Sequence, residues 1–135
     1  MTLLSFAAVL IFLITNLIES GGSQQPSVAQ QIDDYRKHCV EISDVSVESA
    51  IKVHTGQTID NPDWSTKRYV QCFFEKMQFM DENGVMLKDA VVEFFGKVQG
   101  QETAKAMVDN CDIRREDPLD TAYDVLVCYQ RNKSG

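Results

Sequence analysis

Four cysteines, Cys39, Cys72, Cys111 and Cys128, constrain the fold of this 135-residue chain more than any other feature. Each lies in a stretch whose apolar residues recur at helical spacing, so each crosslink between them should join two helices. A four-cysteine zinc site would require cysteine pairs separated by two to four residues, and the sequence contains no such pair. We therefore expect disulfides and no metal centre.

The first 23 residues predict a secretory signal peptide. Residues 2–18 carry no charge and are mostly apolar, and Glu19 is followed by the small residues "SGGS". An apolar run of about 17 residues is at the short limit for spanning a bilayer, so we expect cleavage and not a retained anchor. The remaining residues, 24–135, have the size of one domain. Disulfides form readily in the oxidising compartment that such a chain enters.

The charge of the chain limits its partners. Its formal net charge is −7, and loss of Glu19 with the signal peptide changes this to −6. An acidic surface repels nucleic acid and anionic membranes. We therefore expect no nucleic-acid partner and no stable membrane insertion.

Apolar periodicity predicts six helices and no sheet. The third helix is apolar over so wide an arc that it should be central to the domain. Ser46 and Asp117 are expected N-caps, Pro118 takes a first helical position, and Gly56 ends the second helix. The predicted segments are residues 26–43, 46–56, 65–80, 87–98, 101–111 and 118–129.

The helix order suggests how the cysteines pair. A short turn joins the fifth and sixth helices, and an antiparallel hairpin would bring Cys111 close to Cys128. Cys39 then remains for Cys72, which ties the first helix to the third. In the chain-entropy model each disulfide stabilises the fold by roughly 3–4 kcal/mol.

The sequence offers no catalytic constellation. His38 flanks the inward stripe of the first helix, and His54 precedes the helix-ending Gly56, so both histidines are expected at the surface or at a rim. The segment "DENG", residues 81–84, lacks the spacing of a calcium loop and is interpreted as a turn. No phosphate-binding glycine loop and no HExxH motif occur. We therefore expect no enzymatic activity, no cofactor and no metal.

Two segments carry a family resemblance: "CFFEKMQFMDENG", residues 72–84, and "DPLDTAYDVLVCY", residues 117–129. Together with the signal-like N-terminus and the cysteine spacings, they resemble the insect odorant-binding proteins of the pheromone-binding and general odorant-binding family. Members of that family typically have six cysteines. Here Arg68 and Leu119 stand at the places of two that normally bond to each other, so the chain resembles the four-cysteine, "minus-C" branch. The family pairing implies the same two disulfides as the helix order.

The resemblance implies an all-α, six-helix fold around an apolar cavity that reversibly binds odorants, pheromones or other small lipophiles. It also implies secretion into sensillum lymph or another body fluid. We expect a monomer or weak homodimer, with a chemosensory receptor as an indirect partner. The alternative is a secreted helical signalling, saliva or venom protein that acts through its surface.

Helical periodicity directs one set of apolar side chains inward, where they would form either the wall of a ligand cavity or an ordinary core. Tyr123 and Tyr129 lie beside this set, and each could donate a hydrogen bond to an alcohol, aldehyde or ester. The expected wall residues are Phe73, Met77, Leu87, Val91, Phe94, Met107 and Leu126.

Overall fold

The computed structural model describes residues 27–134. The predicted signal peptide and its boundary after residue 23 lie outside this range. Contacts between residues divide the chain into two units, of which the first ends at Asp33 and the second begins at Asp34. The described part of the first unit is Ser27 and the opening turns of the first described helix. The contacts, pockets and site residues discussed below belong to the second unit.

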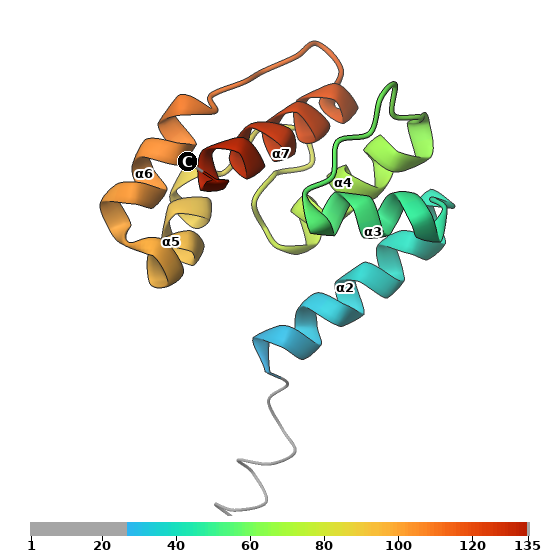
Figure 1. Ribbon diagram of the computed structural model, residues 1–135, viewed down its shortest axis with the longest axis horizontal. Coiled ribbons are helices and arrows are strands. Elements are labelled where there is room, and N and C mark those ends of the chain that lie inside the picture. The colour runs from blue at the N-terminus through green and yellow to red at the C-terminus, as the bar shows by residue number, and fades with distance from the viewer. Residues whose placement is uncertain (1–26, 135) are drawn as a thin grey trace, which may run out of the picture. The chain divides into compact units, whose positions relative to one another are not determined.

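Residues 27–134 form six α-helices and no β-strand, as the sequence predicts (Figure 1). The single regular pairing outside the helices, within this range, is an isolated bridge between Met80 and Met86. No described helix is both long and apolar enough to cross a membrane. The helices are α2 (Val28–Ser43), α3 (Val47–Thr55), α4 (Trp64–Lys76), α5 (Lys88–Gln99), α6 (Gln101–Asn110) and α7 (Pro118–Ser134).

The helix ends follow from local side-chain chemistry. The Ser46 hydroxyl accepts the backbone N–H of Ser49 at 3.1 Å and caps α3. Gly56 ends that helix with a φ of 75°, a conformation that costs glycine little. At the start of α7, the carboxylate of Asp117 accepts the backbone N–H of Leu119 at 2.9 Å. These expected caps are present.

Helix α4 is shorter than predicted. It ends at Lys76, whereas apolar periodicity continues to Met80. Gln78 has a φ of 62°, which breaks the helical path. The Phe79 carbonyl then accepts the backbone N–H of Leu87 at 2.6 Å, so the chain beyond Gln78 pairs with the next segment.

Helix α7 continues further than predicted, to Ser134. The predicted segment ended at Tyr129, because the residues that follow are polar. However, the side-chain amide of Gln130 donates to the Val53 carbonyl at 2.7 Å, which holds this part of α7 against the end of α3. A long-range contact therefore stabilises a segment that local propensity leaves undecided.

The second unit is built on two close helix pairs. α5 packs on α6, and α4 packs along α7, while α3 adds smaller contacts with α4. Figure 1 shows the segment between α6 and α7 as an extended arch, after which α7 runs back towards α6. This path brings the end of α6 beside the last turns of α7, and α4 is central, as its wide apolar arc predicts.

Candidate functional site

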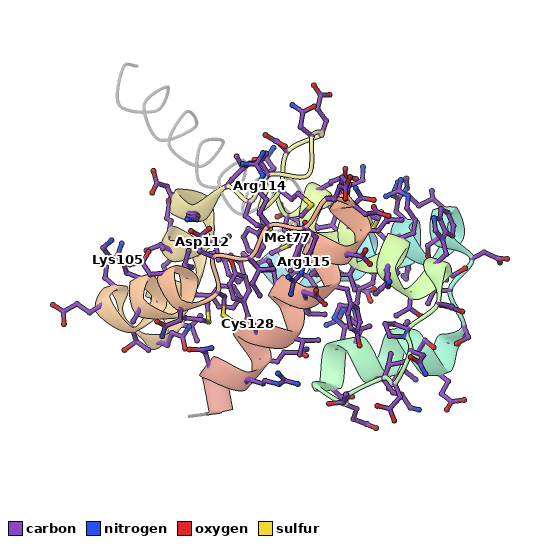
Figure 2. All side chains as sticks on the ribbon, turned by 90° about the horizontal axis from the view of Figure 1, so that it is seen from above. Met77, Lys105, Asp112, Arg114, Arg115 and Cys128 are labelled. Carbon is purple, nitrogen blue, oxygen red and sulfur yellow. A yellow bond between two sulfur atoms is a disulfide. The ribbon has the colours of Figure 1, made fainter. Side chains whose placement is uncertain are left out.

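Two disulfides fasten the helices that surround the interior. Cys39 on α2 is bonded to Cys72 on α4, and Cys111 at the end of α6 is bonded to Cys128 on α7. No cysteine is free in the described residues. Figure 2 shows the Cys128 sulfur on α7, together with Asp112 and Arg114 on the segment that joins α6 to α7. Both predicted pairs are thus present.

The interior of the second unit is aromatic. Five rings make a chain of contacts in which neighbouring centroids lie 5.2–6.4 Å apart, in tilted or edge-to-face arrangements. Such geometry suits the quadrupoles of the rings and adds specific attraction to the burial of apolar surface. α4, the bridge-forming segment after it, α5 and α7 each contribute. This aromatic cluster consists of Phe74, Phe79, Phe94, Phe95 and Tyr129.

Most of the predicted wall residues belong to the same hydrophobic core as the aromatic cluster. Val91 and Met107 are buried, while Phe73, Met77 and Leu126 are half-buried and pack against the same core. Phe94 belongs to the cluster itself. Leu87 differs, because it precedes α5 and is 38 % exposed. The structure therefore gathers six of the seven predicted residues into one core.

The two predicted hydrogen-bond donors are both buried, but their environments differ. The Tyr123 hydroxyl lies 3.4 Å from the carbonyl oxygen of Ile59, to which it donates. Burial, reinforced by the charge of Asp112, raises the pKa of Tyr129 to about 12. The Tyr129 hydroxyl therefore keeps its proton at neutral pH and remains a donor.

Two surface pockets lie on either side of the segment between α6 and α7. One, here called the α7 pocket, has a volume of about 410 Å³. The other, the loop pocket, has a volume of about 420 Å³ and includes Met86. Ile113 lines both, so its side chain stands between them. The α7 pocket is lined by Thr58, Ile59, Ile113, Arg115, Tyr123, Asp124, Val127, Cys128, Arg131 and Asn132.

A third pocket, the α3 groove, has a volume of about 300 Å³. Its walls come from α2, α3 and α4 and are mainly aliphatic. None of its members is among the wall residues that the sequence predicted. The α3 groove is lined by Arg36, Val40, Val47, Ala50, Ile51, His54, Thr55 and Tyr69.

His54 is more enclosed than the sequence predicted. Its Nε2 atom and the Tyr69 hydroxyl share a hydrogen bond of 2.5 Å, and its ring makes an edge contact with Phe73, at a centroid distance of 5.0 Å. Burial, with a smaller effect of the Arg36 charge, lowers the pKa of His54 to about 4. The imidazole is therefore neutral at pH 7. His38 is exposed, as expected.

The described residues contain no group of three metal-ligating side chains close enough to hold an ion. Within "DENG", the Asp81 carboxylate accepts the backbone N–H groups of Asn83 and Val85, at 2.8 and 2.9 Å. Gly84 has a φ of 81°, and a Cβ atom there would lie 2.5 Å from the Pro118 side chain. The segment is therefore a turn that packs closely on the start of α7.

Arg68 and Leu119 lie on the two helices that a third disulfide would join. Next to them, Lys67 Nζ on α4 donates to Asp120 Oδ1 on α7 at 2.6 Å. That ion pair raises the pKa of Lys67. Arg68 Nη1 lies 3.5 Å from the carboxylate of Glu75 on its own helix. α4 and α7 are thus linked here by charge and packing.

The comparison with protein families agrees with this architecture. The family model described as PBP/GOBP matches residues 22–132. The chain belongs to this family. Its four cysteines and two disulfides place it among the insect odorant-binding proteins of the minus-C type.

Two relatives of similar sequence are also odorant-binding proteins. The chain is 44% identical to odorant-binding protein 10 of Aedes aegypti over 104 residues, which cover 77% of this chain and 74% of that protein. It is 30% identical to general odorant-binding protein 56a of Drosophila melanogaster over 111 residues, covering 82% and 76%.

A solved structure is also similar. The fatty acid binding protein OBP56a from the oral disk of the blowfly Phormia regina matches with a TM-score of 0.66 and 28% identity. The match covers 82% of this chain and 96% of the blowfly chain. The two chains therefore share a fold over nearly the whole blowfly protein.

Proposed function

We propose that this odorant-binding family member is a secreted carrier that reversibly binds small hydrophobic ligands within the interior of the second unit. The observation that carries the proposal is the aromatic cluster, which shares its hydrophobic core with Met77 and Met107. Thioether side chains change rotamer easily and accommodate apolar molecules of different shapes. Membership of the family supports a carrier, and the similarity to a fatty acid binding protein of the blowfly supports a lipophilic ligand.

Binding would be driven by removal of apolar surface from water. A micromolar Kd corresponds to about 8 kcal/mol. At roughly 25 cal/mol per Å², this equals burial of about 330 Å² of apolar surface, before the lost freedom of the ligand is counted. A flexible ligand of moderate length supplies that area. The Tyr129 hydroxyl, which stays protonated, would donate to an oxygen atom on the ligand.

The proposal includes secretion with removal of residues 1–23. Two disulfides in a domain of this size suit an oxidising compartment. Mass spectrometry of protein from the medium of a secreting host tests this part. The expected mass is that of residues 24–135 with both disulfides formed, and a retained N-terminus would contradict it.

Uptake of a fluorescent naphthylamine by the disulfide-bonded protein tests the carrier function. We expect saturable fluorescence enhancement that unlabelled lipophiles reverse. Phe94→Leu should weaken uptake because it reshapes the aromatic cluster while preserving an apolar side chain. Val98→Leu, on the same helix at a position that is 77 % exposed, is the matched control. Absence of saturable uptake would favour a protein that acts through its surface.

A further inference from the structure

The α3 groove exposes apolar side chains that folding alone does not require. Val47 is 70 % exposed and Ile51 is 54 % exposed, one turn apart on α3. Both line the same pocket, beside Val40 and Ala50. Single exposed aliphatic residues are common on protein surfaces, whereas neighbouring ones that line a concave surface are typical of binding sites.

The polar side of the groove carries one positive charge at neutral pH. Arg36 forms no hydrogen bond or ion pair with any residue that the structure describes. His54 and Tyr69 are bonded to each other, and the low pKa of His54 keeps its ring neutral. The guanidinium is therefore the cation that faces the groove, in a chain whose net charge is −7.

The volume limits the size of an occupant. A water molecule takes up roughly 30 Å³ in the liquid. A groove of about 300 Å³ therefore accommodates about ten non-hydrogen atoms of that size. This is the size of a short aliphatic carboxylate and much smaller than a protein helix.

We propose that the α3 groove is a second binding site, which holds a short aliphatic carboxylate with its head group on Arg36 and its chain across Val47 and Ile51. A guanidinium binds a carboxylate through two parallel hydrogen bonds, which fixes the orientation of the head group. The aliphatic wall then buries the chain. None of the wall residues predicted for the interior lines this groove, so the groove is separate from the proposed carrier site.

Octanoate, with ten non-hydrogen atoms, is the probe. Titration calorimetry of the intact disulfide-bonded protein should show saturable binding of octanoate and weaker binding of octanol. Arg36→Gln should weaken octanoate binding about tenfold, because it removes the charged partner of the carboxylate. Lys97→Gln, which removes the same charge from an exposed position on α5, should change the affinity less than twofold.

Two further variants locate the probe. Ile51→Ser should weaken both octanoate and octanol, whereas Phe94→Leu should affect naphthylamine uptake and leave octanoate unchanged. The proposal is overturned if octanoate does not saturate, or if Arg36→Gln binds it as well as the natural chain. It is also overturned if Phe94→Leu alone weakens octanoate, because the probe would then lie in the interior.

Self-association is the competing use of the same surface. Light scattering across a concentration series tests it with the same variants. A dimer that Ile51→Ser dissociates would assign the groove to a second copy of the chain and overturn the proposal. A protein that fails to take up naphthylamine and still binds octanoate through Arg36 would refute only the carrier site.

Discussion

The aromatic interior and the α3 groove are both apolar, but they differ in how they are enclosed. In the interior, aromatic rings contact one another and Val91 is fully buried. In the groove, Val47 and Ile51 remain largely exposed beside a guanidinium. Burial accounts for the residues of the interior by stability alone. The exposed residues of the groove gain little from folding, so binding explains them better.

The largest expected effect comes from the disulfide that supports both regions. Replacing Cys39 and Cys72 by serine should reduce the free energy of unfolding by about 2–5 kcal/mol, because the unfolded chain regains freedom. α2 supplies Arg36 and Val40 to the groove, so octanoate binding should suffer more than naphthylamine uptake. Urea unfolding measures the loss of stability, and the octanoate and naphthylamine titrations measure the two losses of binding.

The double serine variant of Cys111 and Cys128 is the control, because that disulfide joins α6 to α7, away from the groove. Its removal should affect naphthylamine uptake more than octanoate binding. Equal loss of both ligands in both variants would show that the two regions are not separable.

Truncation of a side chain in the aromatic cluster should cause the next largest loss of stability. Phe94→Ala should lower the free energy of unfolding by about 2–3 kcal/mol, somewhat below the cost at a fully buried phenylalanine. Val98→Ala on the exposed face of α5 should change it by less than about 0.5 kcal/mol. Urea unfolding gives both values. Similar costs for the two variants would contradict a packed interior around Phe94.

Introducing the third disulfide should affect the aromatic interior and leave the α3 groove unchanged. Cysteines introduced together at Arg68 and Leu119 lie beside the Lys67–Asp120 ion pair and should bond across α4 and α7. A crosslink of this span is worth up to about 4 kcal/mol in the chain-entropy model, and engineered examples often give less. The melting temperature should rise, and naphthylamine exchange should slow.

Octanoate exchange should stay the same in the variant with the introduced disulfide, since no residue of α7 lines the groove. Each single cysteine variant serves as a control that cannot form the bond. If the bond forms and neither stability nor naphthylamine exchange changes, α4 and α7 do not gate the interior.

The smallest effect is a pH dependence that arises in the groove. Because the pKa of His54 is lowered from 6.5 to about 4, the unfolded chain takes up a proton before the folded chain does. Stability is therefore complete above pH 6.5 and declines between pH 6.5 and 4. The imidazole is partly exposed, so we expect a loss on the order of 1 kcal/mol.

Urea unfolding at several pH values measures the decline, and His54→Phe should reduce it. Arg36→Gln should reduce it less, because burial is the main cause of the low pKa. A decline that is identical in His54→Phe would assign it to the carboxylates of the acidic chain.

Local signals in the sequence predicted much of the fold. Ser46, Gly56 and Asp117 each act through contacts within a few residues, so their roles as helix ends are legible from the sequence. The end of α4 could not be predicted from such local signals. It depends on Gln78 in a left-handed conformation and on pairing between Met80 and Met86, while apolar periodicity continues past both.

The interior and the α3 groove also differ in how far the sequence predicts them. The interior follows from periodicity, since Phe73, Val91 and Phe94 lie on inward faces of regular helices. The groove depends on the association of three helices, and one of its polar members, His54, was expected at the surface or at a rim. Periodicity describes one helix at a time and cannot reveal such a surface.

The most direct test of the carrier function is a titration of the disulfide-bonded protein with naphthylamine, followed by the NMR signals of its methionine methyl groups. Met77, just after α4, and Met107, on α6, both belong to the hydrophobic core. We predict that both methyl signals shift saturably and give the same Kd as the fluorescence titration. Signals that stay unchanged while fluorescence saturates would place the probe outside the interior and contradict the account.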